Sequence, residues 1–238
     1  MSRRFVLSCI LVLIVDLSLA AEEKTASPTS LPPPYRDKFL VAEPVSPNKQ
    51  FAVIYPRKYV CVGETENKDC QDYLVALRPF QIITKLETVS PEFEHKNLGG
   101  MSVAWSGDST VALITLESHY GPGEIFVVEL RDGKVVRSAN LLNKIRERLE
   151  PDYLASNVGE PFNDYVHFVF EDEERSGEKQ PTVELKGKTV QVHAYATNDP
   201  NMSRDTVWEG KFDGAWDVAQ GKFTSVKVTR EFAGLRKR

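Results

Sequence analysis

Four histidines are the first residues whose chemistry could define a function: His95, His119, His167 and His193. None stands at the spacing of a metal-ligating pair, and no His-Glu-x-x-His motif occurs. His167 and His193 each lie in a segment that alternates like a β-strand. Two interpretations therefore stay open: a proton-active or metal site where the two strands pair, or two half-exposed strand histidines, which the pattern favours.

The sequence contains none of the common motifs that indicate a catalytic centre. There is no Gly-x-Ser-x-Gly elbow, no Walker loop and no Gly-x-Gly-x-x-Gly fingerprint. Carboxylates are abundant, and Glu171 and Asp217 are the pair we consider for an acid and base. A glycosidase-type mechanism needs two carboxyl groups roughly 5–10 Å apart in a cleft. The sequence thus predicts no catalytic residues, no metal site and no cofactor, and it keeps a hydrolase only as an alternative.

Aromatic residues in loops point to recognition. An aromatic cluster spans residues 208–223 with glycines between its members, and core packing is its default role. Trp216 falls in an expected loop at 213–217, where it could stack on a glycan or peptide. His119 and Tyr120 precede Gly-Pro-Gly in a second loop. We therefore predict Trp216, His119 and Tyr120 as exposed binding contacts.

The cysteines suggest an oxidising compartment. The sequence has three cysteines, and Cys9 lies in the apolar run near the N-terminus, which leaves Cys61 and Cys70 for the exported chain. These two enclose a polar segment that is typical of the tip of a β-hairpin. An exported chain with two cysteines usually pairs them, and closing so short a loop stabilises a fold by about 2–3 kcal/mol. The other interpretation, a redox or metal thiol pair, lacks the Cys-x-x-Cys spacing. We predict a Cys61–Cys70 disulfide.

Residues 1–20 have the layout of a secretory signal peptide. Arg3 and Arg4 precede an apolar run at 5–15, and Ser18 and Ala20 occupy positions −3 and −1 of a cleavage site. The run rises only about 16 Å as a helix, less than the roughly 30 Å of a bilayer core. The sequence predicts export to the periplasm or the extracellular space, with no membrane span after cleavage. An uncleaved anchor is the alternative.

The remaining chain divides into three parts. Residues 21–37 form a Pro-rich linker, 38–230 a single β-rich domain, and 231–238 a basic C-terminal tail. Without residues 1–20 the chain has 28 Lys and Arg against 33 Asp and Glu, a net charge of −5. This balance argues against nucleic acid as a partner. An unknown protein, peptide or glycan is expected instead, and the sequence does not tell whether Asn201 is glycosylated.

Short strands separated by turns dominate residues 38–230. Alternation and turn residues predict strands at 38–42, 51–55, 59–62, 73–77, 80–86, 101–105, 111–116, 124–130, 135–138, 165–171, 182–185, 189–196, 206–212 and 223–229. One short helix is predicted at 141–149, capped by Asn140 and ending before Pro151. No βα alternation occurs, so the fold class is mainly β, with antiparallel meanders.

Two segments resemble each other. A small-polar turn beginning at Ser46 enters the strand Phe-Ala-Val-Ile, and a similar turn beginning at Ser106 enters Val-Ala-Leu-Ile. With the later Asp-Gly turn at 132–133, the segments 46–86 and 104–138 resemble blades of the TolB/WD40-like β-propellers. The resemblance implies propeller-like blades, but only three such units fit the chain. An open curved sheet and a two-layer β-sandwich are the other architectures.

Taken together, the sequence favours an exported, non-catalytic binding or interaction domain stapled by a disulfide. A cell-envelope hydrolase or carbohydrate-active enzyme using paired carboxylates is the alternative, and a purely structural companion of another protein is a third interpretation. The first would be contradicted if Trp216, His119 and Tyr120 were all buried and the structure had no concave or exposed apolar patch.

Overall fold

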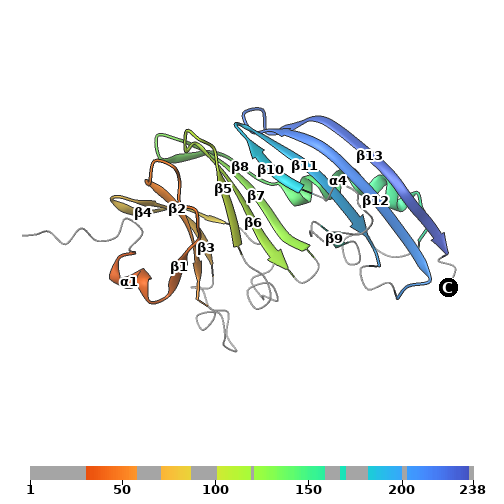
Figure 1. The fold of residues 1–238 in the computed structure, drawn as a ribbon, viewed down its shortest axis with the longest axis horizontal. Helices are drawn as coiled ribbons and strands as arrows, with labels where there is room; N and C mark the ends of the chain where they lie inside the picture. The colour runs from red at the N-terminus through yellow and green to blue at the C-terminus, as the bar shows by residue number, and fades with distance from the viewer. Residues whose placement is uncertain are drawn as a thin grey trace, which may run out of the picture.

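The computed structural model describes residues 31–57, 71–86, 101–118, 121–158, 167–169, 182–199 and 203–235. Within them the chain folds into three antiparallel meander sheets that follow one another along the long axis of the molecule (Figure 1). The mainly β fold class with antiparallel meanders is therefore confirmed. Cys61, Cys70, His119 and Tyr120 lie outside the described residues, as do residues 1–30.

Each sheet is built from consecutive strands. The first sheet has the order β1 (Phe39–Val41), β2 (Phe51–Pro56), β3 (Asp72–Leu77) and β4 (Phe80–Leu86), preceded by the short helix α1 (Pro33–Arg36). The second has the order β5 (Met101–Trp105), β6 (Val111–Ser118), β7 (Gly121–Arg131) and β8 (Lys134–Asn140). The third has the order β10 (Thr182–Lys186), β11 (Thr189–Thr197), β12 (Thr206–Asp217) and β13 (Lys222–Leu235). The short strand β9 (His167–Val169) pairs with the last residues of β11.

The sheets pack face to face. On β6, Val111 and Leu113 enter one hydrophobic cluster with the third sheet, while Ala112 and Ile114 enter another with the first sheet. Successive side chains of a strand point to opposite faces. A strand buried on both faces must therefore be apolar at every position, which is why β6 reads Val-Ala-Leu-Ile without a polar break.

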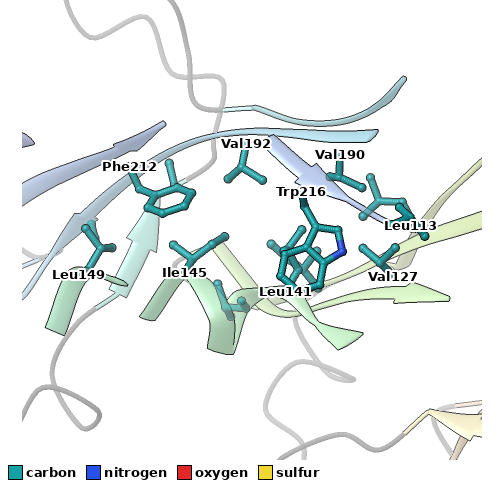
Figure 2. Packing of buried hydrophobic residues seen from close by; sticks show 14 of the residues in the cluster. Leu113, Val127, Leu141, Ile145, Leu149, Val190, Val192, Phe212 and Trp216 are labelled. Atoms are coloured by element: carbon teal, nitrogen blue, oxygen red, sulfur yellow. The ribbon is translucent and has the colours of Figure 1, made fainter. Parts of the chain in front are cut away.

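The helix α4 (Leu141–Leu154) lies between the second and third sheets. As predicted, Asn140 caps it, and its side-chain oxygen accepts a hydrogen bond from the Asn143 N–H at 3.1 Å. Ile145 and Leu149 face Phe212 of β12 in the shared cluster (Figure 2). The amphipathic pattern thus packs the helix onto a sheet.

The predicted end of this helix is wrong, because α4 continues through Pro151 to Leu154. Proline lacks an N–H and cannot bond the carbonyl four residues earlier. Contacts beyond the proline offset that loss. Tyr153 is fully buried edge-on against Trp208, and the Asp152 carboxylate accepts a hydrogen bond from the Trp208 indole N–H at 3.0 Å. Tertiary packing overrides the local stop signal.

The two similar turns of the sequence adopt the same structure. In the first, Ser46 Oγ accepts the Phe51 N–H at 2.9 Å and donates to Asn48 at 2.8 Å. In the second, Ser106 Oγ accepts the Val111 N–H at 2.9 Å and donates to Asp108 at 2.6 Å. The turns also touch, since the Asn48 N–H donates to Ser109 Oγ at 3.0 Å. The same serine-centred turn therefore occurs twice, at the same end of neighbouring sheets.

The fold extends beyond both limits drawn from the sequence. Leu31 and Tyr35, in the predicted linker, pack with Phe39, Ile54 and neighbouring residues over the outer face of the first sheet. At the other end β13 runs to Leu235, five residues into the predicted tail. Residues 31–37 and 231–235 are therefore part of the folded domain.

Candidate recognition surface

The third sheet has one face packed on the hydrophobic core and one polar face that points outward. Along β11 and β12 every second residue enters the core, and its neighbours face outward. Cross-strand partners share a face, so the register assigns the outward residues: Glu184, Gln191, His193, Tyr195, Glu209, Lys211, Asp213 and Lys227. We call this set the outer face. Unlike the first sheet, it is not covered by any described segment of the chain.

His193 and Asp213 form the central pair of this face. They are direct cross-strand partners, and His193 Nδ1 lies 2.7 Å from Asp213 Oδ1. Both side chains are about half exposed, at 53% and 46%. The Asp213 carboxylate can only accept a hydrogen bond, so Nδ1 of His193 must carry the hydrogen and donate it. This hydrogen bond fixes the orientation of the imidazole. Nε2 is then the ring nitrogen that Asp213 does not engage.

Charges of both signs surround this pair. Lys186 lies 2.8 Å from Glu184, and Lys211 lies 3.4 Å from Glu231. The Lys186 hydrogen bond is the main cause that lowers the pKa of the Glu184 carboxyl, and His193 adds a smaller attraction. Exposed ion pairs contribute little to stability. Their consequence here is a mixed pattern of charge rather than a single-sign patch.

A rigid aromatic layer supports the outer face from below. The inward positions of β12 alternate aromatic and glycine residues: Trp208, Gly210, Phe212, Gly214 and Trp216. A Cβ built on Gly210 would lie 2.6 Å from the Trp208 ring, and one on Gly214 would lie 2.6 Å from the Phe212 ring. The rings therefore lie flat over the glycines beside them. This layer fixes the strand backbone from which His193 and Asp213 are presented.

Trp216 belongs to that layer, so its predicted role as an exposed contact is wrong. Its side chain is 4% exposed and lies in the cluster beside Val127 and Leu141 (Figure 2). Its ring meets Phe223 edge-on, with centroids 5.1 Å apart. The strand β12 continues to Asp217 where the sequence suggested a loop, and position 216 falls on its inward face. Core packing, the default role of this aromatic cluster, is what the structure shows.

The two histidine strands pair, but not in the register that would join their imidazoles. His167 is opposite Thr197, four residues along β11 from His193. Strands rise about 3.3 Å per residue, so the two backbone positions are about 13 Å apart. The structure therefore gives His193 a carboxylate partner in place of a second histidine. The signal that could have found Asp213 was the alternation of β12, once the β11–β12 register was known.

Asp217 has a structural use. Its carboxylate accepts the Gln220 N–H at 2.8 Å and the Gln220 side-chain amide at 2.7 Å, which closes the β12–β13 turn. These hydrogen bonds lower the pKa of the Asp217 carboxyl. A general acid needs a raised pKa, so this position does not suit that role. Glu171, its predicted companion, lies outside the described residues.

The sequence did not predict an ionic network that lies close to the β10–β11 and β12–β13 turns. Glu129 of β7 is nearly buried and lies 2.6 Å from the Arg137 guanidinium and 3.9 Å from the Lys188 ammonium. Arg137 also donates to the Val218 carbonyl at 2.9 Å, which links the second and third sheets. Each residue comes from a different turn or strand, so no sequence spacing reveals the network.

The oxygen-rich segment from Asn198 to Asp205 is also structural where it is described. Asp199 Oδ1 accepts the N–H groups of Ser203 and Arg204 at 2.7 and 3.1 Å. Asn198 Oδ1 accepts the Trp208 N–H at 2.8 Å. Within the described ranges, no three His, Cys, Asp or Glu side chains gather as metal ligands would.

Comparisons with known proteins add no family. No family model and no curated protein matches the chain. No helix in the part of the chain that the structure describes is long and apolar enough to cross a membrane.

Proposed function

We propose that the chain is an exported, non-catalytic interaction domain that binds a partner protein through the outer face. The observation that carries the proposal is the His193–Asp213 pair, held at 2.7 Å in the middle of an exposed and rigidly supported sheet face. The pair directs one ring nitrogen away from its carboxylate, where a partner could donate or accept a hydrogen bond. The secretory layout of residues 1–20 supports export.

The charge pattern favours a protein partner over a nucleic acid or an anionic membrane surface. Glu184, Glu209 and Asp213 interleave with His193, Lys211 and Lys227 on the outer face. A polyanion requires clustered cations, whereas interleaved signs fit a protein surface with complementary charges. Such complementarity mainly sets specificity and association rate.

Site-specific photocrosslinking in the exporting cell tests this proposal. A photoreactive phenylalanine analogue placed at Gln191 or Lys211 is expected to give one discrete adduct of higher mass. The matched control is Arg148, which is exposed on α4, the helix that packs against the inner side of the third sheet. The adduct should weaken when His193→Ala and Asp213→Ala are combined in the crosslinking chain. Equal adducts from Arg148, or none from the outer face, would contradict the proposal.

A further inference from the structure

We infer that two copies of this chain associate through the free edge of β13, so that the third sheets of both copies join into one continuous sheet. The inference concerns the edge of the sheet and shares Lys227 with the outer face. Its test measures association between copies of this chain and not partner binding, so the two proposals can fail separately.

The first observation is that β13 is a long edge strand. It spans Lys222–Leu235 and, among the described strands, pairs only with β12. An edge strand presents a row of backbone N–H and C=O groups on its open side, which is a template for pairing with another strand. Many protein edges are short, whereas this one matches β12 in length, and its two register shifts against β12 fall at Thr224 and Glu231.

The second observation is the concentration of exposed apolar side chains on this strand. The described residues include five large hydrophobic side chains that are strongly exposed, and three of them lie on β13: Val226 at 42%, Phe232 at 39% and Leu235 at 75%. A fourth, Leu154, ends α4, whose Asp152 is bonded to Arg230 of β13 at 2.9 Å. These side chains are distributed along β13 and over both of its faces, so they would be covered by a partner that follows the strand along its length.

The third observation is charge complementarity under two-fold symmetry. An antiparallel copy of β13 whose two-fold axis passes through Thr229 places Lys227 opposite Glu231 of the second copy, and Glu231 opposite Lys227. Val228 then faces Arg230 of the second copy, so no like charges stand directly opposite within this stretch. Lys227 and Glu231 both lie on the outward side of the strand, since Lys227 pairs with Asp213 and Glu231 lies 3.4 Å from Lys211. Opposite charges across strands are a stabilising combination, and a two-fold interface is self-complementary. A second copy therefore fits this edge.

Charge-swap variants of the full exported chain test the inference by light scattering on a sizing column over a concentration series. The wild type is expected to dimerise. Lys227→Glu and Glu231→Lys should each weaken the dimer by on the order of a hundredfold, because symmetry applies each like-charge clash twice. The double swap should restore it. Lys222→Glu is the matched control: the same charge change on the same strand, outside the paired residues.

Hydrogen exchange provides a readout that needs no variant. Amide protection of residues 227–231 should increase with protein concentration, while protection of the buried strand β6 stays constant. A monomeric wild type at all concentrations would overturn the inference. So would a dimer that both single swaps leave intact, since its interface would lie elsewhere. Unchanged exchange in β13 across the dimerisation range would overturn it as well.

Discussion

A single methyl group on the inward face of β12 should measurably destabilise this protein. In Gly214→Ala the new Cβ would lie 2.6 and 2.8 Å from two atoms of the Phe212 ring and 3.2 Å from Phe223. Carbon atoms prefer about 3.5–4.0 Å, so the Phe212 ring must withdraw by about 1 Å. That ring is fully buried, with α4 packed against it. It has little space into which to move.

The magnitude follows from two opposing contributions. Overpacking a filled core costs about 1–3 kcal/mol. Replacing glycine in a strand recovers roughly 0.5–1 kcal/mol of backbone entropy. We expect a net loss of about 1–2 kcal/mol in the free energy of unfolding. For a domain of this size that corresponds to a Tm lower by roughly 2–8 °C.

Urea unfolding followed by tryptophan fluorescence measures this loss, because Trp208 and Trp216 are both buried. Gly107→Ala is the control, since a Cβ there meets nothing within 4 Å. In a Phe212→Leu background the methyl group has room, and the cost of Gly214→Ala should shrink. A Gly214→Ala protein as stable as wild type would refute the reasoning, as would an equal cost in both backgrounds.

Three further predictions concern polar groups. Hydrogen bonds, above all that from Ser106, lower the pKa of Asp108 from 3.8 to about 2. The ionised carboxylate therefore stabilises the fold above pH 3.8, and this contribution is lost as the pH falls towards 2; because the side chain is half exposed, we expect it to be about 1 kcal/mol. Asp108→Asn should accordingly lose less unfolding free energy than the wild type when the pH is lowered over this range. Asn140→Ala removes the α4 cap and the amide donor to buried Glu124, so its unfolding free energy should fall by about 1–2 kcal/mol, against no change for exposed Asn143→Ala. Among the described cations, Arg137→Ala leaves Glu129 with the more distant Lys188 and should cost about 2–3 kcal/mol in urea unfolding. A value equal to that of exposed Arg131→Ala would contradict this network.

Local chemistry made much of the fold predictable. The Asp-Gly pair at 132–133 predicts a tight hairpin, and both residues have positive φ, 52° and 72°, which such a turn requires. Asn140 predicts a helix start because its side chain can cap one. Alternation along residues 189–196 is enough to separate an inward from an outward face of that strand. In each case the information lies within a few residues.

Features that depend on distant partners escaped prediction. Trp216 has the same neighbours in sequence whether it is exposed or buried, and only the length of β12 places it inside. Pro151 indicates a stop, and the contacts of Asp152 and Tyr153 with Trp208 decide otherwise. The His193–Asp213 pair spans twenty residues and needs the register of β11 on β12. Sequence patterns indicate faces, whereas tertiary contacts determine which residues meet.

The same patterns also indicate where the stack of sheets ends. The middle sheet is apolar on both faces of β6, and the first sheet is covered by Leu31 and Tyr35. The third sheet instead presents His193, Asp213 and interleaved charges on its outer face. Stacking a further sheet there would remove these charges from water, at several kcal/mol for each unpaired ion. Face-to-face growth into a closed ring is therefore disfavoured at this sheet. This agrees with our two proposals, a protein partner on the polar face and a second copy at the β13 edge.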